Sequence, residues 1–550
     1  ARSGGGITDS GVITVAGTSL FNSDVSGQVI TLDSTNAMTG AVSITHTGSA
    51  NVAIDNGTTA LNLGTVGVGQ NFSARSGGGI TDSGVITVAG TATFVTDVDD
   101  IDIVLDSNNA ITGALTFTTQ TGGSNGADIT FDNGSTAISL AAFTTEGDLT
   151  LSTDAAIALT GHTVNGDLTV TSAAAISQSA AVTVSGTSSF TSTGSNSNIT
   201  LSTDSNALTG AVSAATAGSS GDVTIDNGTT ALDIAASTIG GNLGVTAGDS
   251  ITDSGVITVT GTASFTTDTS DKLITLNSQN AITGQVIFST TGTGGDVTLD
   301  NGTTAISLGT ISSGDIGGDL RLLTDAAQTI SNAITLNGSG AALNITVDNS
   351  NSLNVQNALT TNAGSITLSA DDDILFTAAG DLNSNNGNIS VTADDDATSD
   401  ANSGGALTLA DGTVFNAGSG AITATSDENL TLGQMTTTNS STSAITLNSK
   451  SGNILDGGDT GEDLTAASGT IVVSSGGTFG TTTNGIERTS AGLNTSGVTT
   501  SLEDETASST LTGTSETVGD ASVDQTINIV EDLAKTVEKN NQVTVGGSSS

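Results

Sequence analysis

The side chains that could do chemistry are unevenly supplied in this chain. It has 55 aspartate and glutamate residues but only 8 lysines and arginines, 2 histidines and no cysteine, tryptophan or tyrosine. The histidines, His46 and His162, stand in non-equivalent sequence contexts, and we predict that both lie at exposed turns. No nucleophile elbow, phosphate-binding loop or zinc-ligand spacing occurs, so the sequence favours a protein that is not an enzyme.

Polysaccharide cleavage is the enzymatic activity to weigh against this expectation. A lyase needs cationic groups that neutralise an acidic sugar, and the few basic residues here stand singly along the chain. A glycosidase needs two carboxylates across a cleft, and aspartate is plentiful. However, sugar clefts usually supply aromatic platforms, which a chain without tryptophan or tyrosine lacks. We therefore expect no catalytic residues and no required cofactor.

Calcium is the metal for which the sequence offers candidate ligands. Two runs of three aspartates lie one coil length apart, so they could stack into an acidic ridge, and hard carboxylate oxygens in turns suit Ca²⁺. No EF-hand loop or calcium-binding nonapeptide is present, and solvated acidic faces explain the same residues. The candidates are Asp371, Asp372, Asp373, Asp394, Asp395 and Asp396, with a further acidic cluster at Asp97, Asp99, Asp100 and Asp102.

Five Asn-Gly-Thr or Asn-Gly-Ser triplets match the acceptor pattern for N-glycosylation. The same residues make good tight turns, and we favour that interpretation. The triplets begin at Asn56, Asn133, Asn227, Asn301 and Asn337.

The segments that carry these residues are repeated. The first eighteen residues, ARSGGGITDSGVITVAGT, return letter for letter at 74–91, and weaker copies follow. The isoleucines of the ITDSG phrase and its degraded version are Ile7, Ile80, Ile176 and Ile251, so the second of the three intervals is the longest. It exceeds the third by about 21 residues, which is the length of one layer in many solenoids. Because each layer of a solenoid contacts only its neighbours, we interpret the excess as one inserted layer.

Alternation of apolar and polar residues favours strands over disorder, although only 35% of the residues are hydrophobic. Phrases such as VITV, DLTL and NITL are flanked by Asn, Asp, Gly, Ser and Thr, which form turns. These features predict an all-β chain that folds as a parallel β-helix, or β-solenoid, with roughly 20–23 residues per coil. We expect these side chains to point inward: Ile13, Val15, Ile30, Leu32, Ile86, Val88, Ile274 and Leu276.

The repeats divide the chain into four parts. Residues 1–325 hold four long repeats of about 73–96 residues, each several layers long. Residues 326–500 hold irregular coils of about 20–25 residues, within the range of single solenoid layers. Residues 501–521 are a linker or a frayed last coil. Residues 522–550 are predicted to hold a short amphipathic helix over about 523–540 and a polar tail, because apolar residues fall at helical spacing after a capping box. The helix would cap the solenoid, dock a partner or be incidental.

The formal net charge of −47 restricts the partners. Such a surface repels nucleic acid and anionic membranes but attracts divalent cations. No stretch approaches the roughly 18 consecutive apolar residues of a membrane-spanning helix, so we expect no such segment. The sequence begins within a repeat, so we interpret Ala1 as an internal cut or a processed start.

The phrases ITDSGVITVTGTASFTTD, NAITGQVIFSTTGTGGDVTLDNGTTAISL and GSITLSADDDILFTAAGDLNSNNGNISVTA resemble those of filamentous-haemagglutinin-type large exoproteins. These are bacterial surface adhesins built from β-strand repeats, and the resemblance extends to about residue 480. It implies a right-handed parallel β-helix that is exported and displayed on, or released from, a bacterial surface. An N-terminal secretion domain normally precedes the repeats in that family, and this chain shows none.

The function that we predict is therefore a non-enzymatic, extracellular or cell-surface β-solenoid that acts in adhesion or as a stiff surface stalk. Its partners would be cell-surface or matrix components, bound through many weak contacts rather than one deep pocket. The alternative is a self-assembling subunit of an extracellular filament, sheath or surface layer, which contacts copies of itself end to end or side by side.

Overall fold

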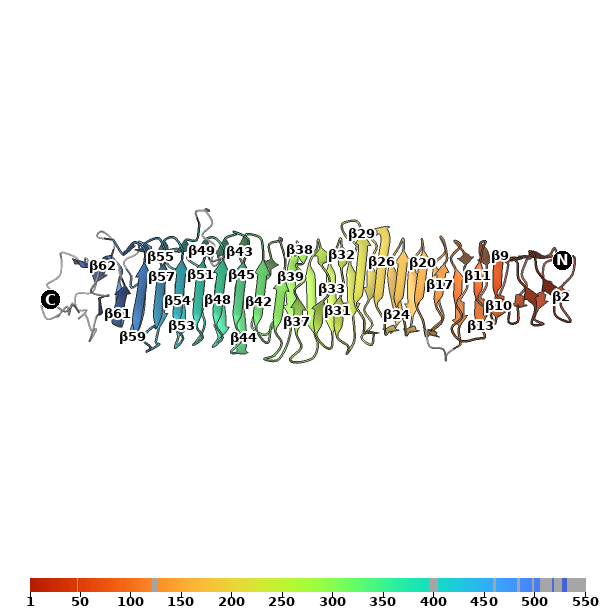
Figure 1. Ribbon diagram of the computed structural model, residues 1–550, viewed down its shortest axis with the longest axis horizontal. Coiled ribbons are helices and arrows are strands. Elements are labelled where there is room, and N and C mark those ends of the chain that lie inside the picture. Colours follow the sequence, from red (N-terminus) through yellow and green to blue (C-terminus); the bar gives the residue numbers. More distant parts are fainter. Residues whose placement is uncertain are drawn as a thin grey trace. The chain divides into compact units, whose positions relative to one another are not determined.

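The computed structural model describes residues 1–46, 48–120, 126–394, 404–458, 461–481, 485–496, 499–504, 517–518 and 527–531. The chain divides into two compact units, Ala1–Thr266 and Thr267–Ser550. Every regular element in the described residues is a β-strand, and the strand pairs are parallel (Figure 1). The predicted all-β parallel β-solenoid is thus confirmed for each unit, whereas its right-handed winding stays a prediction. The described part of the chain contains no helix that could cross a bilayer.

A regular coil of the first unit carries three strands, so that the unit has three faces. The coil that begins at Leu149 and ends before Leu168 shows this arrangement, because each of its strands pairs with the corresponding strand of the next coil. The strands of the two coils are β20 (Leu149–Thr153), β21 (Ile157–Thr160) and β22 (Thr163–Val164), followed by β23 (Leu168–Ser172), β24 (Ile176–Ala180) and β25 (Thr183–Val184).

The sequence repeat and the structural coil are out of phase. Ile7 of the first copy is stacked on Ile30, and two further coils lead through Val52 to Phe72. Ile80 of the second copy lies eight residues beyond Phe72, on the next strand. Three coils plus one face therefore separate the two identical phrases. The strands that form this stack are β2 (Ile7–Thr8), β5 (Ile30–Leu32), β8 (Val52–Asp55) and β10 (Phe72–Ser76).

The same shift of eight residues follows both later intervals. Between the second and third copies the stack has four coils, and between the third and fourth it has three. The excess length before the third copy is therefore one whole coil, as the sequence predicts. The first stack is Ile80, Ile103, Ile129, Leu149 and Leu168, then Ile176; the second is Ile176, Ile199, Val223 and Leu243, then Ile251.

The core of each coil is filled by aliphatic side chains and phenylalanines. Six of the eight residues predicted to point inward are fully buried, among them Ile86 and Val88. Ile13 and Val15 are only half-buried, because a neighbouring coil covers the first described coil on one side only. Phenylalanines also belong to this core. Four buried rings contact one another in sequence at centroid distances of 5.7 to 5.9 Å: Phe72, Phe94, Phe117 and Phe131.

The second unit has the same plan with less regular coils. Along one face, three coils of equal length are followed by a longer one, through the stacked residues Leu320, Leu343, Ile366, Ile389 and Ile422. The similar phrases SITLSA and NISVTA therefore occupy adjacent coils, and so do AITATS and AITLNS. The strands of this face are β42 (Leu320–Thr324), β45 (Leu343–Val347), β48 (Ile366–Ala370), β51 (Ile389–Ala393), β54 (Ile422–Ser426) and β57 (Ile445–Ser449).

The C-terminal helix predicted over about 523–540 is not confirmed. Ile527–Glu531 form a strand, β64, which pairs in parallel with β62 (Thr499–Asp504). The sequence INIVE also alternates with the period of a strand, and its backbone groups pair with those of β62. The other residues of the predicted helix lie outside the described residues.

Candidate functional site

Three phrases recur in the long repeat: ITDSG, NAxTG and DNG. They meet at one corner of the solenoid, in three successive coils. Asp82, from the ITDSG phrase, accepts hydrogen bonds from the backbone N–H and hydroxyl of Ser107 and from the side-chain amide of Asn109. Asn109, from the NAxTG phrase, accepts a hydrogen bond from Ile86 N–H. Asn133, from the DNG phrase, continues the column one coil further on. The repeat therefore encodes a buried polar column that fixes the register of neighbouring coils.

The DNG phrase supplies the third member of this column, whose side-chain amide bonds only to backbone groups. The side chain of Asn133 accepts from Ile111 N–H at 2.8 Å and donates to the carbonyl oxygens of Ile111 and Ala137, both at 3.0 Å. Asp132 Oδ1 accepts from the N–H of Gly134, whose φ of 51° a β-carbon would strain. The equivalent asparagines at 56, 227 and 301 are also buried. Turn chemistry thus explains these four triplets.

Replacing Asn133 with alanine is expected to lower the free energy of unfolding of the surrounding coils by about 2–4 kcal/mol. The change leaves the N–H and C=O of Ile111 buried without their partner, and each such group costs about 1–3 kcal/mol. Asn337→Ala, in the exposed fifth triplet, is the matched control and should change little. Hydrogen exchange of residues 103–140 would measure the effect, and equal protection in both variants would contradict a structural role for the column.

Two aspartates of this column that stand in identical sequences have pKa values shifted in opposite directions. Asp9 and Asp82 belong to the letter-for-letter repeat and make equivalent hydrogen bonds. Burial raises the pKa of Asp82 above its usual value, because the strand β9 (Leu61–Val68) packs against its coil. Burial is also the largest single influence at Asp9, but there the donated hydrogen bonds of Asn36 and Ser34 outweigh it and the pKa is lowered.

The four candidate calcium ligands that the structure describes engage backbone or side-chain groups of other coils. Asp371 accepts from Asn349 N–H at 2.6 Å, and Asp373 accepts from Gly405 and Ala406 N–H groups at 3.0 and 2.9 Å. Asp372 accepts from Ser352 Oγ, and Asp394 lies 3.9 Å from the Lys450 ammonium. Asp395 and Asp396 lie outside the described residues.

That these aspartates bind calcium stays a prediction. Among the residues that the structure describes, they do not form a group of three whose carboxylate oxygens all lie within 4.8 Å. In the N-terminal acidic cluster, Asp97 pairs with Arg75 at 2.8 Å, and Asp102 accepts from Asp128 N–H at 3.0 Å. Of these six carboxylates, those of Asp371, Asp373 and Asp102 accept hydrogen bonds from the backbone of an adjacent coil.

A different acidic cluster, which the sequence analysis missed, lies in the second unit. Asp456, Asp463 and Glu487 are all buried, and their carboxylate oxygens lie within 4.8 Å of one another. Burial, and then the nearby charge of Asp456, raise the pKa of Asp463 to about 9. Asp463 is therefore protonated at neutral pH. We call these three residues the acid cluster.

The histidines are buried, so the prediction that both lie at exposed turns is wrong. His46 ends β7 (Val42–His46), and its Nε2 bonds to the carbonyl oxygen of Gln28. His162 is 1% exposed, and its ring packs against Phe143 at a centroid distance of 4.9 Å. Its Nε2 accepts from Thr160 N–H, and burial lowers its pKa to about 4. A largely aliphatic core accommodates a neutral imidazole, which the sequence context does not reveal.

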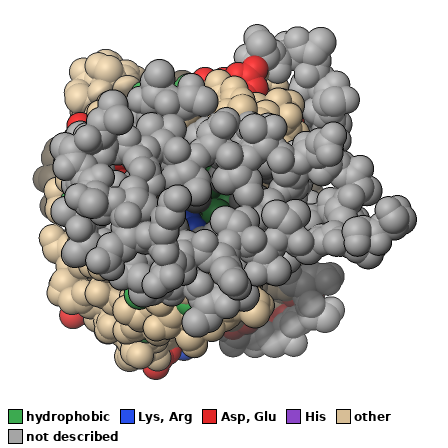
Figure 2. Space-filling view, turned by 90° about the vertical axis from the view of Figure 1, so that its left-hand side faces the viewer, with side chains coloured by type: hydrophobic (Ala, Val, Ile, Leu, Met, Phe, Trp, Pro, Cys, Tyr) green, Lys and Arg blue, Asp and Glu red, His purple; other side chains and the backbone are tan. Residues whose placement is uncertain are grey.

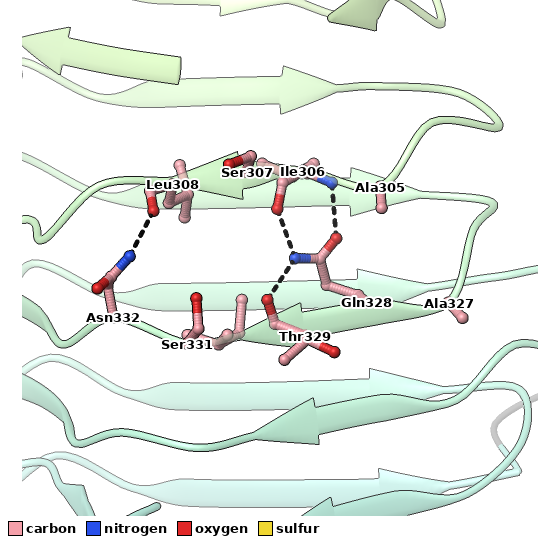
Figure 3. Close-up of a pocket in the computed structure, with 10 residues that line it drawn as sticks. Ala305, Ile306, Ser307, Leu308, Ala327, Gln328, Thr329, Ser331 and Asn332 are labelled. Carbon is pink, nitrogen blue, oxygen red and sulfur yellow. Dashed lines mark hydrogen bonds between the residues drawn. The ribbon is translucent and has the colours of Figure 1, made fainter. Parts of the chain in front are cut away.

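A cavity of about 200 Å³ opens between β41 (Ser307–Leu308) and β43 (Gln328–Ile330) (Figure 3). The backbone ladder between neighbouring coils is interrupted here, and two side-chain amides bridge the gap. Gln328 donates to the carbonyl oxygen of Ile306 and accepts from its N–H, both at 2.7 Å, and Asn332 donates to the carbonyl oxygen of Leu308. None of the ten lining residues is charged. The cavity therefore lacks the paired carboxylates of a glycosidase.

The net charge of the sequence is reflected at the surface. In Figure 2, aspartate and glutamate side chains lie at the edge of the described atoms, among other side chains and backbone atoms drawn in tan. The charge composition, 55 acidic against 8 basic residues, agrees with this view. Such a surface suits many hydrogen-bonded contacts rather than a single charged site.

Comparison with known proteins adds one similarity. A model of the family described as "Repeats of unknown function (DUF5649)" matches residues 1–45, 49–118, 146–215 and 220–289. These four segments carry the four long repeats of the sequence analysis. No curated protein and no solved structure matches the chain. The chain is thus similar to a repeat family whose function is not known, and its own geometry has to carry the functional argument.

Proposed function

We propose that this protein is a non-enzymatic β-solenoid of the bacterial cell surface or extracellular space, acting in adhesion or as a stiff surface stalk. The resemblance to filamentous-haemagglutinin-type exoproteins supports the location and the right-handed winding. The filled core and the uncharged cavity support the absence of enzymatic activity. In this proposal the protein requires no cofactor, and calcium acts only by bridging acidic faces.

The placement of the repeats carries the proposal. Because each long repeat ends eight residues out of phase with the coil, successive copies lie on successive faces of the first unit. The same surface is therefore presented in three directions around the solenoid axis. A single binding face would instead keep every copy in phase. Contacts on all sides suit an adhesive stalk that meets cell-surface or matrix components in any orientation, and they gain strength through multivalency.

The exposed serine of the ITDSG phrase allows this to be tested face by face. Its equivalents are exposed in all four copies, and the native chain has no cysteine to interfere. Single cysteines at these positions, coupled to a bulky polyethylene glycol, would block one copy each, and the first and fourth copies lie on the same face. The positions are Ser10, Ser83, Ser179 and Ser254.

We expect each single block to reduce retention of protein-coated beads on a matrix-coated surface by a modest factor, and the combined block to abolish it. The uncoupled cysteine variants are the matched controls. If one block abolishes retention while the others leave it unchanged, one face makes the contact and the proposal is wrong. Retention that does not depend on the density of protein on the bead would equally contradict multivalent adhesion.

Self-assembly into a filament, sheath or surface layer is the alternative function. A solenoid whose end strands are left uncovered can pair with a second copy end to end. Open strand edges are templates for further pairing. Electron microscopy of native material separates the two functions, because continuous fibres would support self-assembly and isolated particles would support the stalk.

A further inference from the structure

The acid cluster joins two successive coils of the second unit. Asp456 ends β58 (Ile454–Asp456), and Asp463 directly precedes β59 (Leu464–Ser475) in the same coil. Glu487 directly precedes β61 (Arg488–Ser496), which pairs with β59 in the next coil. The N–H of Glu487 donates to Asp463 Oδ2 at 3.2 Å, and Leu464 N–H donates to the carbonyl oxygen of Glu487 at 3.1 Å. Asp463 and Glu487 are thus neighbours across the boundary between two coils.

Burial makes this arrangement unfavourable for three full negative charges. The side chains are 9%, 2% and 6% exposed in the order Asp456, Asp463, Glu487. Carboxylates this close cannot all ionise in a poorly solvated site, so one retains a proton and donates it to another. Burial, the charges of Asp456 and Glu487 and the hydrogen bond to the Glu487 side chain all act to raise the pKa of Asp463.

The charged groups around the cluster together raise the pKa of Asp463. Glu462 precedes Asp463 and is partly exposed, and Arg488 follows Glu487 and donates from Nη1 to Ser490 Oγ at 2.7 Å. The strands β55 (Leu430–Leu432) and β56 (Gln434–Thr437), which pack from the preceding coil, carry no titratable residue. Within the described residues, the electrostatic influences on Asp463 come from Asp456 and Glu487.

We propose that the acid cluster is a proton-held latch, in which a proton shared between Asp463 and Glu487 holds two successive coils together and its release to water at alkaline pH loosens them. No covalent bond changes, and the only species transferred is the proton. The latch makes the C-terminal coils of the second unit sensitive to alkaline pH.

The sign of the pH dependence follows from the protonation of each state. The folded state keeps the proton on Asp463 up to about pH 9, whereas an unfolded aspartate loses it near 3.8. Between these values the folded state binds more protons, so opening becomes easier by up to about tenfold for each pH unit and levels off above pH 9. Stability from the latch is therefore complete in acid and lost toward alkaline pH.

Hydrogen exchange of peptides covering 454–496 in the full chain, at pH 6 to 10, tests the latch. Each exchange rate is divided by the rate of the same peptide when unstructured at that pH. We expect the opening constant of wild type to rise with pH as above, and that of Asp463→Asn to be nearly independent of pH because its side chain stays neutral. Glu462→Gln is the matched control and should keep the wild-type profile.

A second variant keeps the test decisive if Asp463→Asn does not fold. Glu487→Gln removes one of the two repelling charges, so the total rise between pH 6 and 10 should shrink while the direction stays the same. A wild-type profile that is flat with pH would overturn the latch. Protection that depends on added calcium at fixed pH would also overturn it, because a cation would then hold the coils in place of the proton.

Discussion

Replacing Ile86 with aspartate is expected to destabilise the coils around it by about 3–5 kcal/mol. Ile86 is fully buried in β12 (Ile86–Val88), which is stacked between Val66 of β9 and Ile111 of the next coil. The new carboxylate would enter a core without a partner for its charge, and an uncompensated buried charge costs this much or more. The unfolding temperature by circular dichroism and the exchange of residues 61–118 would measure the loss.

Two variants of the same strand serve as controls for this result. Ile86→Val removes one methylene and should cost only about 0.5–1.5 kcal/mol. Thr87→Asp places the same carboxylate on the exposed side of the strand and should change little. Because a solenoid unfolds coil by coil, the loss of protection in Ile86→Asp should be greatest in the adjacent coils. If Ile86→Asp and Thr87→Asp lose equal stability, the side chains of this strand do not alternate between the core and the solvent.

The coil architecture could be predicted because it rests on local alternation. In the ITV phrase of residues 86–88 the isoleucine and valine point inward and the threonine outward, and the same pattern recurs wherever the phrase does. The insertion of one coil before the third copy could also be predicted, because a solenoid tolerates only whole layers. These inferences need no knowledge of contacts that are distant in sequence.

The face of the solenoid on which each copy of the repeat begins could not be predicted from the spacing of the copies. The interval between the two identical phrases fits either three long coils or three short coils and a further strand. Coil lengths vary, since Ile80 is joined to Leu61 by a short coil and to Ile103 by a longer one. Only the pairing of β10 with β8 shows that Ile80 begins on the next face. The face on which a phrase lies is therefore a property of the summed turn lengths rather than of the phrase.

The acid cluster was invisible to sequence analysis for a related reason. Asp456, Asp463 and Glu487 belong to no repeated phrase and are irregularly spaced along the chain. The sequence instead indicated the aspartate runs at 371–373 and 394–396 as candidate calcium ligands, because they recur one coil apart. Recurrence indicates equivalent positions on successive coils, but it does not show which carboxylates are buried together. Turns of irregular length decide that, and their conformation depends on packing.

His162 is expected to make the first unit less stable in acid. Its pKa falls from 6.5 to about 4 on folding, because burial disfavours the charged imidazolium. Between these values the unfolded state binds the proton and the folded state does not. Stability should therefore decrease as the pH falls from 6.5 to 4, by about 3 kcal/mol in all, and show no further change from this residue below pH 4.

The variant His162→Gln isolates this contribution from the many carboxylates that titrate in the same range. Glutamine cannot take up a proton, yet its side-chain oxygen can accept the hydrogen bond that Thr160 N–H gives to Nε2 at 3.2 Å. Protection of residues 149–172 against hydrogen exchange should match wild type at pH 7 and exceed it at pH 4. His46→Gln is the matched control, and it should retain the acid sensitivity that His162 causes. If His162→Gln loses protection in parallel with wild type as the pH falls, the pKa of His162 does not change on folding, and the acid sensitivity of these coils comes from their carboxylates instead.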